Sequence, residues 1–119
     1  MNEKKYDLEE RLIDFAVAII NLVETLPNTR SGNHLGGQLL RSGTAPSLNY
    51  GEARSAESKS DFLHKMKVCL KELRETHNCL RILHRGKIYL TEIELLDIIN
   101  ECNELISIFV KSIVTANKN

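Results

Sequence analysis

Apolar residues recur in four segments of the chain at alternating intervals of four and three positions, which is the spacing of one face of an α-helix. The segments span residues 8–26, 35 onward, 62–85 and 95–113. Pro27 ends the first, and the turn-rich link PNTRSGNH separates it from the second. Because the links are short and no segment alternates as a strand does, we expect an all-α fold, an antiparallel up-and-down four-helix bundle formed by a single domain, residues 1–119.

Residues with known positional preferences mark the ends of these helices. Ser58 or Ser60 can cap the third helix by accepting hydrogen bonds from free backbone amides, and Gly86 follows its last turn. Thr91 with Glu94 three residues later forms a capping-box pattern for the fourth helix. Pro46 removes a backbone donor, so we expect the second helix to kink or begin afresh near it.

The first and fourth helices carry more apolar residues than one side of a small bundle needs. The additional positions are Ile13, Ile20 and Val23 in the first helix and Ile98, Leu105, Ile108 and Val110 in the fourth. Wide exposed apolar faces commonly mark contacts with other proteins. We therefore expect a subunit interface and a homo-oligomer.

The composition adds few constraints to this picture. The 16 basic and 16 acidic residues cancel, so the net charge calls for neither nucleic acid nor membrane. Three cysteines, Cys69, Cys79 and Cys102, fall inside apolar patterns without CxxC spacing and are expected to be buried thiols, as in a reducing cytoplasm. The start MNEKKYDLEE is not a signal sequence, and no run is long enough to span a membrane, so we expect a cytoplasmic protein.

Charged residues are nevertheless segregated. Residues 30–87 carry 11 basic and 5 acidic groups. At 100° per residue, Lys67, Lys71, Arg74, Arg81 and Arg85 fall within about 80° on the third helix. Acidic rows occur on the first helix (Glu3, Asp7, Glu10, Asp14) and the fourth (Glu94, Asp97, Glu101, Glu104). The basic row, with Arg41 and Arg54 on the second helix, has three interpretations: a contact with RNA or DNA phosphates, a solvated face, or a match to an acidic row of another subunit.

Residues that could carry chemistry do not form a recognisable constellation. His34, His64, His77 and His84 lack metal-binding spacing, and Ser42, Ser47 and Ser58 lack the context of a nucleophile. We expect no enzymatic activity, metal, cofactor or small-molecule substrate.

A polar network is expected where the second and third helices pack together. Its members are Asn49, Glu52, Lys71 and Glu75. Partly buried ion pairs of this kind more often have a structural than a ligand-binding role.

The middle third of the chain resembles the bacterial family of four-helix bundle proteins, which includes proteins associated with intervening sequences of large-subunit ribosomal RNA genes. The resemblance runs from Arg41 to Leu83 and rests on RSGT (41–44), NYGEA (49–53), Ala56, Ser58, DF (61–62), Lys65 and KELRET (71–76). It departs at Cys79 and Leu80, where many relatives have an aromatic residue followed by Leu.

The resemblance implies a bundle that assembles into a ring, a pentamer, with no established enzymatic activity; nucleic-acid binding has been suggested for relatives. Together with the residues, it favours a non-enzymatic, homo-oligomeric helical-bundle scaffold, associated with RNA or a nucleoprotein. The alternative is a protein that binds nucleic acid directly through the basic row of the third helix and the arginines of the second.

Overall fold

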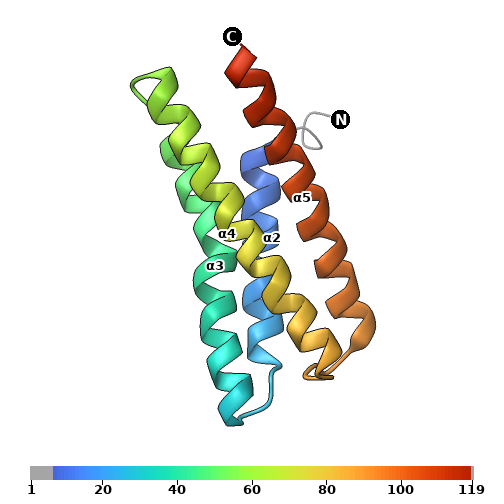
Figure 1. Ribbon diagram of the computed structural model, residues 1–119. Helices are drawn as coiled ribbons and strands as arrows, with labels where there is room; N and C mark the ends of the chain where they lie inside the picture. The colour runs from blue at the N-terminus through green and yellow to red at the C-terminus, as the bar shows by residue number, and fades with distance from the viewer. Residues whose placement is uncertain (1–6, 119) are drawn as a thin grey trace.

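The computed structural model describes residues 7–118 as four α-helices joined by short links (Figure 1). The helices are α2 (Leu8–Glu24), α3 (Arg30–Arg54), α4 (Lys59–Arg85) and α5 (Glu92–Lys118). Consecutive helices run in opposite directions, so that α2 and α4 share one direction, and no strand occurs among these residues (Figure 1). The all-α, four-helix prediction is confirmed.

Three helices begin at a side chain that accepts a hydrogen bond from a free backbone amide. Asp7 accepts from the amide of Glu10 at 3.3 Å, Thr29 from that of Gly32 at 3.0 Å, and Ser58 from that of Asp61 at 3.0 Å. Of the two serines considered for α4, Ser58 is therefore the cap.

The predicted start of the second helix at Leu35 was wrong, because α3 begins at Arg30. The Thr29 cap satisfies the first turn, and Gly32 allows that turn to approach the preceding link closely. A Cβ atom on Gly32 would lie 2.1 Å from the carbonyl oxygen of Pro27. The glycine that looked like a loop former is thus a packing residue within a helix.

Pro46 does not divide the second helix, which continues from Arg30 to Arg54. Its ring is buried, and its carbonyl oxygen accepts a 3.5 Å hydrogen bond from the Cys69 thiol of α4. The expectation that the helix begins afresh there was wrong. Burial of the ring and the contact with α4 help to retain the helix despite the missing backbone donor.

Helix α4 ends where predicted, but Gly86 is not the residue in the left-handed conformation. That residue is Lys87, with φ 56°. The amide of Ile88 donates to the carbonyl of Leu83 at 2.9 Å and that of Lys87 to His84 at 3.2 Å, the bonds of a Schellman motif. Helix α5 then begins directly after Thr91, although within the described residues Thr91 and Glu94 form none of the side-chain bonds of a capping box.

The core receives side chains from all four helices. Its largest fully buried members are Leu12, Ile19, Leu22, Leu39, Met66, Leu73, Leu80, Leu83, Leu95, Leu105 and Phe109. Ile98 and Leu105, predicted to widen the outer arc of the fourth helix, instead belong to this core. Helix α3 packs most extensively against α4, whereas α2 and α5 touch over a much smaller area.

The cysteine prediction is confirmed, because Cys69, Cys79 and Cys102 are all buried free thiols. Burial raises the pKa of Cys69 and of Cys102 to about 12, and raises that of Cys79 as well. Thiols with such pKa values remain protonated near neutrality and are poor nucleophiles.

None of the helices described for residues 7–118 combines the length and apolar character needed to cross a membrane. Glu3, the first member of the predicted acidic row, lies outside the described residues.

Candidate interaction surfaces

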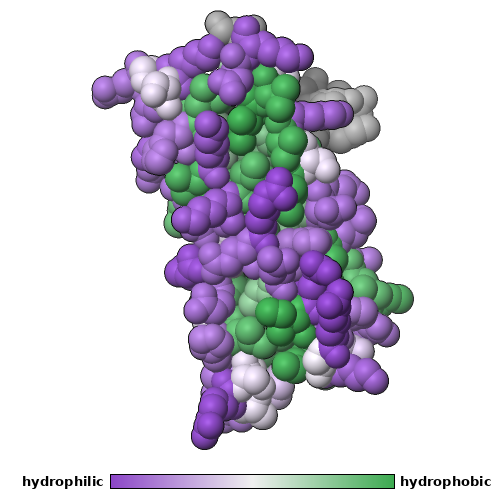
Figure 2. Space-filling view, in the orientation of Figure 1, coloured by the Kyte–Doolittle hydropathy of each residue, from purple (hydrophilic) through white to green (hydrophobic). Residues whose placement is uncertain are grey.

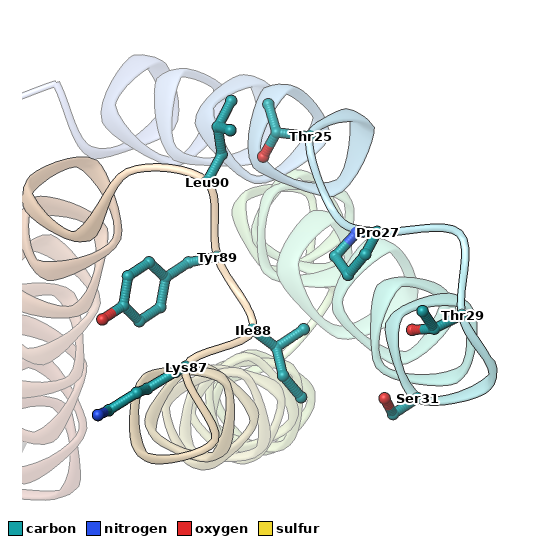
Figure 3. Close-up of a pocket in the computed structure, with 8 residues that line it drawn as sticks. All are labelled: Thr25, Pro27, Thr29, Ser31, Lys87, Ile88, Tyr89 and Leu90. Atoms are coloured by element: carbon teal, nitrogen blue, oxygen red, sulfur yellow. The ribbon is translucent and has the colours of Figure 1, made fainter.

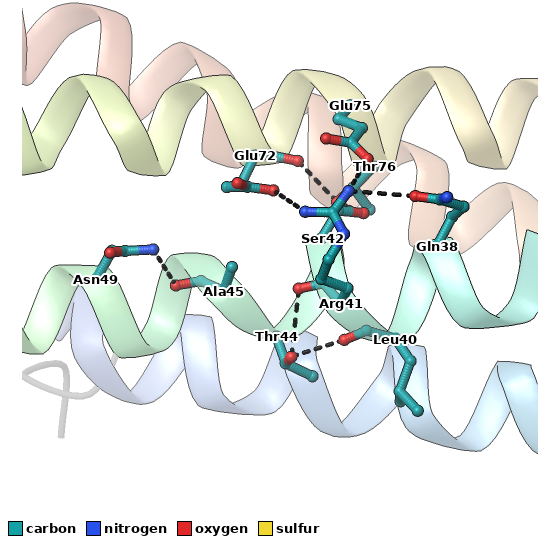
Figure 4. A network of polar contacts seen from close by, with 10 residues as sticks. All are labelled: Gln38, Leu40, Arg41, Ser42, Thr44, Ala45, Asn49, Glu72, Glu75 and Thr76. Carbon is teal, nitrogen blue, oxygen red and sulfur yellow. Dashed lines mark hydrogen bonds and ion pairs between the residues drawn. The ribbon is translucent and has the colours of Figure 1, made fainter.

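Arg41 and Arg54, the two residues of α3 that were predicted to contact nucleic acid, form ion pairs within the chain. The Arg41 guanidinium contacts Glu72 Oε1 at 3.1 Å, Gln38 Oε1 at 3.2 Å, and the carboxylate of Glu75 (Figure 4). Arg54 contacts Glu9 Oε1 of α2 at 2.6 Å. Both side chains are more than half exposed, but their charges are already matched by carboxylates of the same chain.

The predicted polar network between α3 and α4 has different partners from those expected. Glu52 accepts from Lys65 Nζ at 2.6 Å, which raises the pKa of Lys65, and Glu75 binds Arg41. The Asn49 amide donates to the Ala45 carbonyl of its own helix at 3.0 Å (Figure 4). Lys71 is exposed and takes no part in these bonds. Of the four residues predicted, Glu52 and Glu75 do join the two helices, but their partners are Lys65 and Arg41 rather than each other, Asn49 or Lys71.

A fully buried hydroxyl pair lies beside this network. Thr76 Oγ1 and Ser42 Oγ are 2.8 Å apart, and Thr76 Oγ1 also donates to the Glu72 carbonyl at 2.8 Å (Figure 4). The pairs Ser42–Thr76 and Glu52–Lys65 have nearly the same midpoint in the chain, close to Lys59 at the start of α4. Folding the sequence about that point could have identified them.

A further ion pair joins α2 to α5, and sequence reasoning did not predict it. Arg11 Nε contacts Glu101 Oε2 at 2.7 Å, and Arg11 Nη2 contacts Glu104 Oε1 at 2.7 Å. The hydrogen bond with Glu101 is the main cause of a raised Arg11 pKa. Two of the four residues in the predicted acidic row of the fourth helix are thus matched within the chain.

The basic row, defined as Lys67, Lys71, Arg74, Arg81 and Arg85 of α4, differs from the arginines of α3. All five side chains are exposed. Within residues 7–118 none of them forms an ion pair, and Arg81 makes only a 3.5 Å contact with Asn78. Five cations on one side of one helix therefore keep their charge available to a partner.

Two open hollows lie along α4 beside the basic row. One of about 240 Å³ is lined by Asn78, Arg81, Ile82 and Arg85. The other, about 560 Å³, is lined by Lys59, Ser60, Leu63, His64 and Lys67. Neither has an acidic lining residue, so both favour an anionic partner over a cationic one.

Helix α2 presents an apolar strip, defined as Ile13, Val17 and Ile20, whose side chains are 39%, 48% and 40% exposed. The intervals of four and three place all three on one side of the helix. Leu40 of α3 is also exposed, at 42%. Ile13 and Ile20 were among the residues predicted for a subunit interface, and their exposure leaves them available for one.

A second apolar area lies between α4 and α5, here named the α4–α5 face. It comprises exposed Leu96, Val110 and Val114 of α5 and half-buried Leu63 and Leu70 of α4. Figure 2 shows hydrophobic side chains gathered between the upper parts of α4 and α5, with hydrophilic side chains on both sides and in a band below them. Val110 was predicted to lie at an interface; Ile108 and Val23, also predicted, are half-buried.

A hollow of about 410 Å³ opens between the α2–α3 and α4–α5 links, at one end of the bundle. Pro27, Ile88 and Leu90 supply much of its lining, and the side chains of Lys87 and Tyr89 point to the opposite side of their link from Ile88 (Figure 3). Its lining includes no histidine, cysteine or carboxylate. The titratable groups of this lining are the Lys87 amine and the Tyr89 phenol, so a carboxylate or imidazole base would have to come from elsewhere.

The histidines do not converge. His84 Nε2 lies 2.9 Å from Glu92 Oε2, and its ring stacks on Tyr89 with centroids 6.1 Å apart. Burial, and secondarily Arg81, lowers the pKa of His77. Within residues 7–118 no three histidine, cysteine or carboxylate side chains gather as metal ligands would.

Comparison with known proteins places these surfaces in a family context. The model of the 23S rRNA-intervening sequence protein family matches residues 4–111. A 1.70 Å crystal structure of a protein with unknown function from the S23 ribosomal protein family of Bacteroides thetaiotaomicron is 34% identical, with a TM-score of 0.81, over 88% of this chain and 96% of that one. No curated protein matches the chain. The similarity extends well beyond the middle third on which the sequence resemblance rested.

Proposed function

The chain belongs to the 23S rRNA-intervening sequence protein family, and from this premise we propose that it is a non-enzymatic, homo-oligomeric scaffold built from helical bundles. The observation that carries the proposal is the exposed α2 strip. Three large aliphatic side chains on consecutive turns, each about 40–50% exposed, make an unfavourable surface for an isolated bundle in water. Covering them with another copy removes this apolar area from water.

The distribution of polar groups supports a scaffold rather than an enzyme. The shortest ion pairs of the described residues lie between helices, and they join α2 to α5, α2 to α3 and α3 to α4. The buried thiols have raised pKa values, and the hollow between the two links has no histidine, cysteine or carboxylate in its lining. These groups hold the bundle together.

The mass of the purified protein in solution tests this proposal. Native mass spectrometry and light scattering at micromolar concentration should give an assembly of several 13.5 kDa chains. The ring, and the pentamer that the resemblance implied, would appear as one defined mass. A monomer over the whole micromolar range would refute the scaffold proposal.

The second candidate function is direct binding of RNA or DNA phosphates by the basic row. The observation that favours it is the absence of ion-pair partners for these five cations within residues 7–118. Arg41 and Arg54, part of the same prediction, contribute less because their charges are matched.

Electrophoretic retardation of structured RNA and of duplex DNA tests this candidate. Removing one cation that binds a phosphate should reduce the slope of log K against log salt by about 0.7–0.9. Replacing Arg74 and Arg81 by Gln should therefore flatten the salt dependence, whereas replacing Arg41 by Gln should change it little. No retardation at low salt would end this candidate.

A further inference from the structure

The α2 strip has acidic neighbours whose charges are not matched. Glu10, Asp14 and Glu24 are exposed on the same helix and form no ion pair with any residue in 7–118. A partner that covers Ile13, Val17 and Ile20 would therefore also approach carboxylates. The chemistry of this surface fits an apolar partner with a cationic border.

The α4–α5 face has the complementary composition. At 100° per residue, Leu63, Leu70, Arg74 and Arg81 fall within about 40° of one another on α4. On α5, Leu96, Val110 and Val114 fall within about 40°, and Asn103 occupies the gap between them. The apolar centre thus has Arg74 and Arg81 on its α4 side, and on its α5 side Asn103, with exposed Lys111 further around that helix.

The spacing of the charges also matches. Asp14 and Glu24 are ten residues apart, as are Lys71 and Arg81, and each interval spans about 15 Å of helix. Helices α2 and α4 run in the same direction within one bundle (Figure 1). Copies related by rotation about an axis parallel to the bundle would place α2 of one beside α4 of the next, also in the same direction. In a single alignment of these two helices, Asp14 can then face Lys71 while Glu24 faces Arg81.

We infer that the α2 strip of one copy docks on the α4–α5 face of a second copy, with carboxylates of α2 opposite the basic row of α4. This inference rests on the proposed homo-oligomeric function and identifies its interface. The apolar centre contributes affinity, and the charges select register and orientation. Because the two faces differ, the contact is head-to-tail, and it produces a ring when the rotation between copies closes.

Charge reversal tests this contact. The acid-face variant carries Asp14→Lys and Glu24→Lys, the base-face variant carries Lys71→Glu and Arg81→Glu, and the double-face variant carries all four. Each single-face variant should lose assembly, with at least a tenfold increase in the dissociation constant, because like charges then oppose each other. The double-face variant should recover the wild-type mass, since complementarity is restored with inverted sign.

Two controls separate this contact from general charge effects. A variant with Glu57→Lys and Asp97→Lys has the same charge change as the acid-face variant at exposed positions away from both faces, and should assemble as wild type does. Circular dichroism should show that every variant remains helical and melts in a cooperative transition. An equimolar mixture of the two single-face variants should assemble only into even-numbered or open species, because the two chains must alternate.

Failure of the inference is distinguishable from failure of the proposed function. If the wild type assembles and both single-face variants keep its mass, another surface forms the interface and the inference is overturned. If the base-face variant assembles normally but loses RNA retention, the basic row faces nucleic acid, which also overturns it. A monomeric wild type removes the scaffold proposal itself.

Discussion

Gly43 lies where α3 passes α2, and its replacement by Ala should destabilise the bundle even though Ala favours helices. A Cβ atom at this position would lie 2.8 Å from both Cγ1 and Cγ2 of Ile19 and 3.2 Å from its Cβ. Carbon contacts are favourable near 3.5–4.0 Å, so the added methyl is about 0.7 Å too close to two atoms. Ile19 is fully buried and cannot move into solvent.

Two opposing terms determine the magnitude. Overpacking a close-packed core typically costs about 1–3 kcal/mol. Replacing Gly by Ala inside a helix contributes about 1 kcal/mol in the opposite direction. Because Ile19 is fully buried and Gly43 is buried as well, we expect the steric term to exceed the helix term, with a net loss of about 1 kcal/mol in the free energy of unfolding.

Urea denaturation followed by circular dichroism provides the assay, at one fixed protein concentration because self-association also stabilises the fold. With an m-value of about 1–3 kcal/mol/M, the midpoint should fall by roughly 0.3–1 M. Gly37→Ala and Gly51→Ala are matched controls in the same helix, since an added Cβ meets nothing within 4 Å at either site. Both should gain about 0.5–1 kcal/mol.

A double-mutant cycle tests the cause. Ile19→Ala removes both atoms that the new methyl would strike, at a cost of about 2–5 kcal/mol by itself. In that background Gly43→Ala should become neutral or stabilising, because the two closest contacts are gone and only the 3.2 Å contact with the Cβ of residue 19 still opposes the helix term. Equal destabilisation in both backgrounds, or a Gly43→Ala protein as stable as the Gly51→Ala control, would refute the steric explanation.

Three further predictions concern other parts of the bundle. Thr76→Val should lower the free energy of unfolding by about 1–3 kcal/mol, because it leaves the Ser42 hydroxyl buried without its partner. Adding Ser42→Ala removes that hydroxyl and should recover part of the loss in the same urea assay. Burial raises the pKa of Cys69 and Cys102 from 9.0 to about 12, so these thiols lose their protons at lower pH in the unfolded chain than in the folded one. The free energy of unfolding should therefore be unaffected below pH 9 and should fall as the pH rises from 9 toward 12. An unchanged urea midpoint over that range would contradict this prediction. Lys87→Gly should raise the melting temperature, because it removes about 1–2 kcal/mol of strain from a residue in the left-handed conformation. The greater entropy of glycine in the unfolded chain offsets part of this gain. A lower melting temperature would contradict this explanation.

The periodicity of apolar residues was sufficient to predict four helices, because only a helix brings positions spaced by four and three onto one side. Local chemistry was sufficient to predict the end of α4 and to narrow its cap to Ser58 or Ser60, since each depends on residues adjacent in the chain; the structure selected Ser58. Burial of the three cysteines also followed from their positions in apolar patterns. These features require no knowledge of how the helices pack.

Tertiary packing decided the rest. The packing role of Gly32 became visible only with the position of the Pro27 carbonyl, and Pro46 is buried within a continuous helix, where its carbonyl accepts a hydrogen bond from Cys69 of α4. Within the wide apolar arc of the fourth helix, the sequence could not distinguish residues that are buried, such as Ile98, from residues that are exposed, such as Val110. That division depends on which neighbour each side chain meets.

The charged residues show the same limit most clearly. The sequence alone determined that cations follow one side of the third helix, but Arg41 and Lys71 were equivalent candidates until their surroundings were known. Arg41 lies against Glu72 and Glu75, whereas Lys71 of the facing helix points to solvent. Helical spacing is a property of one segment, and ion pairing is a property of two segments brought together. For that reason the row of cations was predictable, and the subset free to bind a partner was decided by the fold.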